Sequence, residues 1–170
     1  MSSLDKKRSA QIYGVPTRKF AMEEGKRILE KILKISPDES EAIKVILPLL
    51  KQLNPFVFEE VLLHACEQWK YHVIRTEKQT NDNGIDGGFA YNGYFYVIQA
   101  KLYSGDTITK HLEMFANAIK WHHATRGFFC HTGRATEEFR QAAATYSMIE
   151  VVSGQKLIDF LLGRRELFVR

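Results

Sequence analysis

Two polar side chains close an otherwise apolar segment in the middle of the chain. Residues 94–101 read Y-F-Y-V-I-Q-A-K, and the alternation of side chains along a strand places Gln99 and Lys101 on one face. Half-burying a lysine costs free energy unless an anion or a carboxylate lies beside it. Asp86 is the candidate carboxylate, because it lies in a glycine-rich turn just before a strand and a tight reversal at Asn92-Gly93.

An acid, an amide oxygen and a lysine at one edge of a sheet suit metal-assisted hydrolysis of a phosphodiester. A hard cation such as Mg²⁺ takes oxygen ligands and keeps several waters, so one Asp, one Gln or Glu and a backbone carbonyl are enough. The cation acidifies a bound water and neutralises charge on the phosphate, and Lys101 would orient that water or stabilise the oxyanion. The same spacing also fits a plain hairpin with a solvent-facing Asp86 and an edge lysine.

The elements that must position these residues follow from the apolar periodicity. Helices are predicted over residues 20–35, 36–53, 56–69, 136–146 and 155–162, and one more begins at residues 104–107. Strands are predicted over residues 72–76, 94–102, 126–132 and 149–152, with a short strand after Asp86. Strands that alternate with helices in the second half imply right-handed crossovers in a mixed sheet. The sequence therefore predicts an α/β fold.

The N-terminal third reads as a leader followed by two amphipathic helices. The apolar stripe expected on the first helix is Ile28, Leu29, Ile32 and Leu33. Ser36, Pro37 and Glu39 predict a capping box at the start of the second helix, and Pro48 predicts a kink or an early end. Its leucines, Leu47, Leu49, Leu50 and Leu53, then need burial. We expect the two helices to pack as a hairpin against the rest of the chain or against a second subunit.

The helix over residues 56–69 and the long helix after Lys101 surround the predicted hairpin. On the first of these helices, the apolar stripe leaves Glu59 on the other side, together with Glu60 and Leu63. A glutamate in a first turn complements the helix dipole without any function, and Glu60 is a competing choice for a functional acid. On the second helix, the apolar set is Ile108, Leu112, Phe115 and Ile119, and we expect this helix to cover the sheet.

Several other polar residues are weaker candidates for a functional site. Asp82 is either a second metal ligand or a turn residue that bonds its own backbone, and the turn is favoured. His131 ends a predicted strand, where polar residues are common, so it is left out of the catalytic set. The histidines and cysteines show no CxxC or HExxH pattern, which argues against structural zinc. Cys66 and Cys130 lie in apolar patterns and are expected to be free, buried thiols.

Length and charge narrow the class of protein. With 170 residues and a net charge of +4, the chain is expected to be one domain, with room for an appended helical part. Residues 1–35 hold nine Lys/Arg against four Asp/Glu, a net of +5, so the other 135 residues sum to −1. This basic end is either a phosphate-contacting arm or a solvated helix face. No apolar run approaches the roughly 20 residues of a membrane span, so we expect a cytoplasmic protein that does not enter a membrane.

The run from Asn83 to Lys101 resembles the active-site hairpin of the PD-(D/E)XK nuclease superfamily, and in detail its Mrr-like restriction endonuclease branch. In that branch a G-[IV]-D turn precedes a Q-x-K strand. Further family motifs are matched in order by Phe58-Glu59, Tyr71-His72-Val73, Gly127–Gly133 and Val151–Gly154, so the resemblance covers about residues 56–162. It implies a restriction-endonuclease-like three-layer α/β/α sandwich. We therefore expect a nuclease core over residues 55–170, preceded by a basic leader and helical extension over residues 1–54.

The resemblance also implies an activity, a metal-dependent endodeoxyribonuclease that hydrolyses DNA to 5′-phosphate and 3′-hydroxyl ends. It implies Mg²⁺ as cofactor with Mn²⁺ as a substitute, held by Asp86, Gln99, Glu59 and the backbone carbonyl of Ala100. Lys101 would position the attacking water. Gln99 stands where most of the superfamily has Glu or Asp, which removes one negative charge, so weaker metal affinity is expected.

Two other functions stay open from the sequence. One is a structure-selective repair nuclease or junction resolvase of the same fold. The other is an inactive module that only binds DNA or a protein partner. Cleavage of both strands needs two active sites, so a symmetric homodimer is expected. Because no helix-turn-helix or zinc finger is visible, recognition is expected from a protein partner, from dimerisation or from DNA structure.

Overall fold

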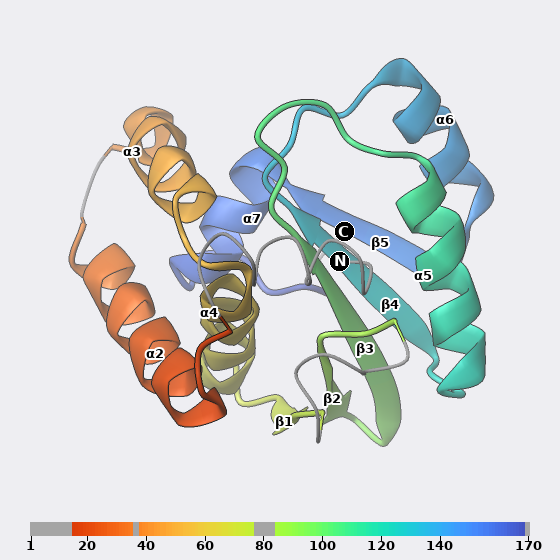
Figure 1. Cartoon of the computed structure of the whole chain (residues 1–170), viewed down its shortest axis with the longest axis horizontal. Coiled ribbons are helices and arrows are strands. Elements are labelled where there is room, and N and C mark those ends of the chain that lie inside the picture. The colour runs from red at the N-terminus through yellow and green to blue at the C-terminus, as the bar shows by residue number, and fades with distance from the viewer. Residues whose placement is uncertain (1–14, 36–37, 77–83, 169–170) are drawn as a thin grey trace.

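A computed structural model describes residues 15–35, 38–76 and 84–168, with five strands in one sheet (Figure 1). The strands, in their order across the sheet, are β1 (His72–Ile74), β2 (Gly87–Tyr91), β3 (Tyr94–Lys101), β4 (Arg126–His131) and β5 (Ile149–Ser153). Strands β1, β2 and β3 pair antiparallel, whereas β3, β4 and β5 pair parallel. The predicted mixed sheet is confirmed, and β3 is its central strand. The leader, Ser36-Pro37 and Asp82 lie outside the described residues.

Helices cover both faces of this sheet, as predicted for a three-layer sandwich. On one face lie α4 (Pro55–Gln68) and α7 (Gly154–Leu161), whose apolar side chains pack with Phe89, Ile98 and Phe128. On the other face lie α5 (Lys110–Trp121) and α6 (Glu137–Thr145), which pack with Val97 and Phe129. Figure 1 shows the two helical layers on either side of the strands.

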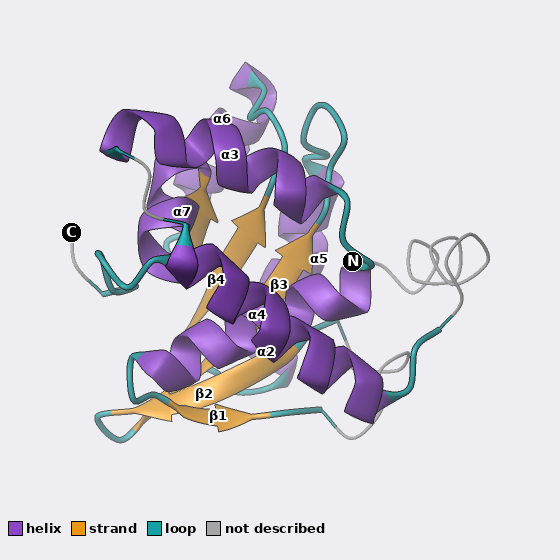
Figure 2. Cartoon of the chain, turned by 90° about the vertical axis from the view of Figure 1, so that its left-hand side faces the viewer, coloured by secondary structure: helices purple, strands orange, loops and turns teal. Residues whose placement is uncertain are grey.

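The N-terminal helices form an additional outer layer. Helix α2 (Arg18–Lys34) packs along α4, and α3 (Glu39–Lys51) packs on α7, so each makes its main contacts with a core helix rather than with the other (Figure 2). Their buried side chains belong to the same apolar cluster as those of α4, α7 and the sheet. The two helices therefore do pack against the core, as expected, but not as a closed hairpin.

Three details of the helices differ from the sequence prediction. Leu33 is 42% exposed, because the buried face of α2 runs through Ala21, Gly25, Ile28 and Ile32. Helix α3 begins at Glu39, with Asp38 at its N-cap and no side-chain cap bond. Helix α5 begins only at Lys110, because Thr107 first donates its backbone N–H to the carbonyl of Arg134 (3.1 Å). The chain before α5 is thereby held beside the loop after β4, and Ile108 is left exposed.

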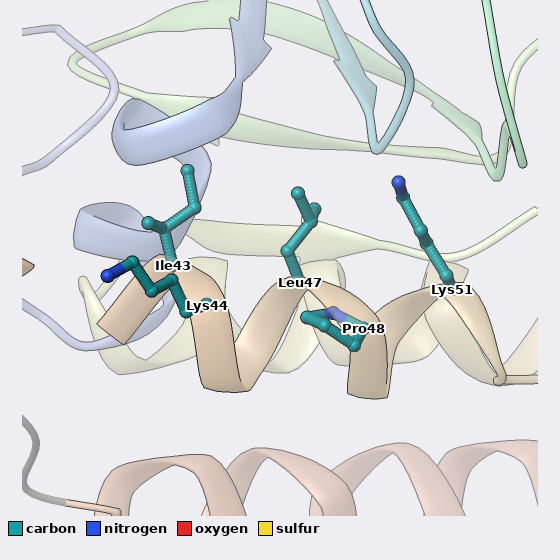
Figure 3. Close-up of a pocket in the computed structure, with 5 residues that line it drawn as sticks. All are labelled: Ile43, Lys44, Leu47, Pro48 and Lys51. Atoms are coloured by element: carbon teal, nitrogen blue, oxygen red, sulfur yellow. The ribbon is translucent and has the colours of Figure 1, made fainter. Parts of the chain in front are cut away.

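Helix α3 keeps Pro48 inside its last turns and ends three residues later, at Lys51. Of its leucines, only Leu50 is fully buried, whereas Leu47 and Leu49 are partly exposed. Leu47 lines a shallow groove on this helix together with Ile43, Lys44, Pro48 and Lys51 (Figure 3). The expectation that all the leucines of this segment need burial was therefore wrong for Leu47.

Other local signals in the sequence are confirmed. The side chain of Asn54 caps α4 by accepting from the N–H of Phe56 (3.0 Å), and Thr136 caps α6 by accepting from the N–H of Phe139 (3.1 Å). Asn92 and Gly93 both have positive φ angles, 49° and 81°, as the tight hairpin turn between β2 and β3 requires. Among the described residues, no helix is both long enough and apolar enough to cross a lipid bilayer.

The close approach of α2 to α4 gives a first prediction. A Cβ atom at Gly25 would lie 2.6 Å from Cβ of Glu60 and 3.0 Å from the carbonyl carbon of the same residue. Backbone cannot move aside as a flexible side chain can, so Gly25→Ala should lower the free energy of unfolding by about 1–3 kcal/mol despite the better helix propensity of alanine. Urea unfolding measures the change. Lys26→Ala, at the exposed neighbouring position, should stay within about 0.5 kcal/mol of the natural chain, and equal stability of the two variants would contradict the packing.

Candidate active site

The β2–β3 hairpin brings the predicted acid and amide together. The N–H of Asp86 donates to the carbonyl of Ile98 (2.8 Å), the residue that Gly87 already faces in the ladder, so Asp86 lies just before β2 and beside Ile98 and Gln99. Oδ2 of Asp86 accepts from Nε2 of Gln99 (2.6 Å) and from the backbone N–H of Ala100 (2.7 Å). Two of the residues predicted for the site are thus in direct contact, although the sequence had offered Asp86 as the partner of Lys101.

This contact also orients the amide of Gln99. An ionised carboxylate can only accept hydrogen bonds, so the nitrogen of the amide must face Asp86. The carbonyl oxygen of Gln99 then points away from that carboxylate. A carboxylate oxygen and an amide oxygen are of the kind that a hard cation takes as ligands.

Lys101 lies on the same face of β3 as Gln99, at the C-terminal end of the central strand. In the parallel register Gln99 is opposite Phe129 and Lys101 is opposite His131, so all four side chains face the α5–α6 layer. Only 5% of Asp86 and 4% of Lys101 are exposed. The plain hairpin with a solvent-facing acid and an edge lysine is therefore wrong, because β3 is flanked on both sides and both residues are buried.

Helix α4 carries the fourth predicted residue, Glu59. We expected it away from the core, but both Glu59 and Glu60 are buried, because α2 covers one side of α4 and the sheet covers the other. Leu63 lies one helical turn after Glu59, and a Cβ atom at Gly87 would lie 2.8 Å from its side chain. Glu59 is therefore on the sheet-facing side of α4.

The competing residue, Glu60, has a different surrounding. It faces α2 at the close approach to Gly25, and its carboxylate forms an ion pair with Arg75 (3.0 Å) and lies 3.7 Å from the ring of His64. This network ties α4 to the segment after β1. We therefore retain Glu59, and not Glu60, as the helix-borne candidate.

His131 is more deeply placed than the sequence suggested. It is fully buried at the end of β4, with its ring among Phe129, Phe139 and Tyr103. Its Nδ1 accepts from the backbone N–H of Gly133 (3.1 Å), so the neutral ring carries its proton on Nε2. Burial lowers the pKa of His131 to about 4, which keeps the ring uncharged near neutral pH.

This histidine gives a prediction for stability against pH. The unfolded chain binds a proton at His131 below about pH 6.5, whereas the folded chain does so only below about pH 4. Its contribution to stability is therefore complete above pH 6.5 and is lost as the pH falls towards 4, by about 3 kcal/mol in total. Urea unfolding at pH 7 and pH 4.5 should show the loss. In His131→Asn, which keeps an acceptor for Gly133 but does not titrate, the loss between pH 7 and pH 4.5 should be smaller by about 2 kcal/mol, because pH 4.5 still lies above the folded pKa. An unchanged pH dependence would contradict the assignment.

One contact near the end of β3 was not predicted from the sequence. The hydroxyl of Tyr103 lies 2.6 Å from Nδ1 of His111, and the two rings stack at 5.8 Å. These residues are eight positions apart across an irregular loop, so no periodicity pairs them.

The buried thiols, in contrast, are as expected: Cys66 and Cys130 are both free, and burial raises the pKa of Cys130 to about 12.

The donor set around Asp86 suits a particular kind of cation. Among the residues that the structure describes, no three His, Cys, Asp or Glu side chains gather in one place to hold a metal. The contact of Asp86 with Gln99 brings one carboxylate and one neutral amide together here, whereas Glu59 comes from α4, which covers the other face of the sheet. An all-oxygen set with few charges fits Mg²⁺ or Mn²⁺ better than zinc, which prefers nitrogen and sulfur.

Comparison with known families agrees with this geometry. The family model Mrr_cat, described as "Restriction endonuclease", matches residues 50–161, about two-thirds of the chain. The chain belongs to the Mrr-like restriction endonuclease family. The matched range contains all five strands together with Glu59, Asp86, Gln99 and Lys101. The resemblance seen in the hairpin is confirmed at the level of the family and of its restriction-endonuclease-like fold.

One relative in this family is the type IV methyl-directed restriction enzyme EcoKMrr of Escherichia coli (strain K12). It is 28% identical over 150 residues, which cover 78% of this chain and 49% of that enzyme. The chain therefore spans about half the length of the curated relative it matches. No solved structure matches the chain.

Proposed function

We propose that this Mrr-like chain is a metal-dependent endodeoxyribonuclease, a hydrolase that cleaves phosphodiester bonds in DNA. The observation that carries the proposal is the buried contact of Asp86 with Gln99 beside Lys101, at the end of the central strand. Burying an acid, an amide and an ammonium group together costs free energy that apolar side chains would not cost. Family membership supplies a reaction in which these three groups are used.

The proposed cation is Mg²⁺, with Mn²⁺ as its substitute, at Asp86, Glu59, Gln99 and the carbonyl of Ala100. When bound, such a cation acidifies water and neutralises charge on the phosphate. Gln99 adds an oxygen but no charge, so the affinity should be lower than with a third carboxylate. The helix-borne Glu59 then becomes important, because it is the second negative charge of the set.

The residues of the chain have distinct roles in the proposal. The N–H of Ala100 and the amide of Gln99 hold the carboxylate of Asp86 in one orientation. Asp86 in turn aims the carbonyl oxygen of Gln99 away from itself. Lys101 lies on the same strand face and is buried, so its ammonium has few alternative positions. We assign it to orient the attacking water and to stabilise the negative oxygens of the phosphate.

Cleavage of purified DNA tests the proposal. The chain is incubated with supercoiled, linear, methylated and branched DNA, in Mg²⁺, in Mn²⁺ or in EDTA, beside Lys101→Ala. Methylated DNA is included because the relative EcoKMrr is named as methyl-directed. Cutting that needs the cation and is lost in the variant supports the nuclease. DNA binding without cutting on every substrate would make the chain a non-enzymatic module.

Four further points belong to the same proposal. Cleavage of both strands would need two sites, so we propose a symmetric homodimer, which sedimentation of the purified chain measures. We propose a cytoplasmic location, where DNA is the available substrate. We also propose that a protein partner can add DNA recognition. The division into an extension over residues 1–54 and a nuclease core over residues 55–170 remains a prediction.

A further inference from the structure

The imidazole of His131 has two ring nitrogens in different surroundings. Nδ1 accepts from the backbone N–H of Gly133 (3.1 Å), whereas Nε2 has no hydrogen-bond partner among the residues that the structure describes. The side chain is completely buried. A buried polar atom without a partner costs free energy, and in folded proteins such an atom commonly binds an ordered water or serves the function of the protein. No step of the proposed reaction uses this atom.

The tautomer and the charge of the ring follow from these surroundings. Because Nδ1 accepts, the proton of the neutral ring is on Nε2, and the Nε2–H group of His131 is a donor. Burial lowers the pKa of His131 to about 4, so the ring is uncharged near neutral pH. An uncharged ring can lie beside an ammonium group without repulsion between like charges. Both groups are donors, however, so they cannot bond to each other and can only share an acceptor.

Lys101 is the neighbour of His131 on the next strand. Strands β3 and β4 pair parallel with Lys101 opposite His131, and neighbouring strands lie about 4.8 Å apart, so the two side chains stand next to each other on one face of the sheet. Lys101 is 4% exposed and His131 is 0% exposed. Two buried N–H donors therefore lie side by side at the C-terminal ends of these strands, two residues beyond Gln99.

Packing alone does not require a histidine at the end of β4. The ring of His131 lies among the rings of Tyr103, Phe129 and Phe139, at centroid distances of 5.8, 6.0 and 5.4 Å. A phenylalanine would fill the same space without burying a polar atom. The bond to Gly133 uses only Nδ1. The feature that distinguishes histidine at this position is thus the donor at Nε2.

From this arrangement we propose that His131 is a positioning residue for Lys101, an inference that rests on the proposed nuclease function. The Nε2–H of His131 and the ammonium group of Lys101 donate to one buried water, which can accept from both because it has two lone pairs. The shared water holds the side chain of Lys101 in one direction. The other N–H groups of the ammonium then stay directed at the attacking water and at the phosphate.

Two variants of His131 separate the roles of its two nitrogens. His131→Gln places an amide N–H near the position of Nε2, whereas His131→Asn places an acceptor near Nδ1 and no group at Nε2. Single-turnover cleavage in Mg²⁺ should stay close to the natural rate with His131→Gln and should fall about ten- to a hundredfold with His131→Asn, the usual effect of losing a residue that orients an active-site group. DNA binding in Ca²⁺ should change little in either variant, because Lys101 acts in the reaction step. A rate for His131→Asn equal to or above that of His131→Gln would assign the histidine to the turn at Gly133 and overturn the inference.

An NMR measurement tests the contact without DNA or cleavage. In the natural chain the Nε2–H signal of His131, identified by its loss in His131→Asn, should show a cross peak to a long-lived water. Lys101→Met should shift this signal, because the water loses one of its two donors, whereas Lys120→Met on the exposed surface of α5 should not. A signal without a water cross peak, or one that Lys101→Met leaves unchanged, would overturn the inference and indicate that the N–H points at the ring face of Phe139. Since no turnover is needed, this failure is distinct from a failure to cleave DNA.

Discussion

Asp86→Asn is expected to lower DNA cleavage by about a hundred- to a thousandfold or more, while the chain stays folded. The variant removes a negative charge from the proposed cation site, and a single group that stabilises developing charge is commonly worth this much. It has a second effect, because the new amide can still accept from Ala100 but can also donate to Gln99. The amide of Gln99 would then turn its carbonyl oxygen inward, away from the cation.

The measurement is a single-turnover cleavage assay in Mg²⁺, with circular dichroism and thermal unfolding to verify the fold. Asp106→Asn is the matched control. Asp106 is an exposed acid on the loop after β3, and it pairs with Arg134 at the surface (2.7 Å). The control should cleave at the natural rate. Activity of Asp86→Asn within tenfold of the natural chain would remove Asp86 from the cation site.

The hairpin shows how much of the site could be read from sequence. Turn chemistry at Asn92-Gly93 sets the register of β2 and β3, and this register brings the start of β2, with Asp86 just before it, beside Ile98 and Gln99. The strand period then places Lys101 on the same face as Gln99. Local rules of this kind need no knowledge of the remaining chain, so the hairpin could be predicted. The sequence offered Asp86 as the partner of Lys101, however, and not of Gln99, to which it is hydrogen-bonded. The mixed sheet followed from crossover rules in the same way.

Residues whose surroundings come from distant parts of the chain could not be predicted. Glu59 looked like an exposed first-turn acid because nothing in its own helix shows that α2 covers one side of α4. Ile108 looked like a core residue because the pairing of Thr107 with Arg134, which delays the start of α5, joins segments 27 residues apart. His131 looked like a polar strand end, but the rings that enclose it come from β4, α6 and the loop after β3. In each case tertiary packing, and not local propensity, decides the burial.

Lys101 provides the test that separates an active enzyme from an inactive module of the same fold. Lys101→Met removes the ammonium group but keeps an unbranched side chain of similar length, which suits a position that is 4% exposed. Proton transfer and water orientation by one side chain typically contribute a factor of about 10² to 10⁴, so cleavage should fall by that factor. Binding of DNA, measured in Ca²⁺ or EDTA, should change little.

Lys101→Arg should not restore the rate, although it restores the charge. The guanidinium group is planar and larger than an ammonium group. Lys101 is buried, with Gln99 on the same strand and His131 opposite it on β4, so a larger group would overpack this position. Lys120→Met, on the exposed surface of α5, is the control for loss of one lysine charge and should retain cleavage of a continuous duplex. If Lys101→Met keeps more than a tenth of the natural rate, the ammonium group does not contribute to the reaction. Lys101 would then have only a structural role.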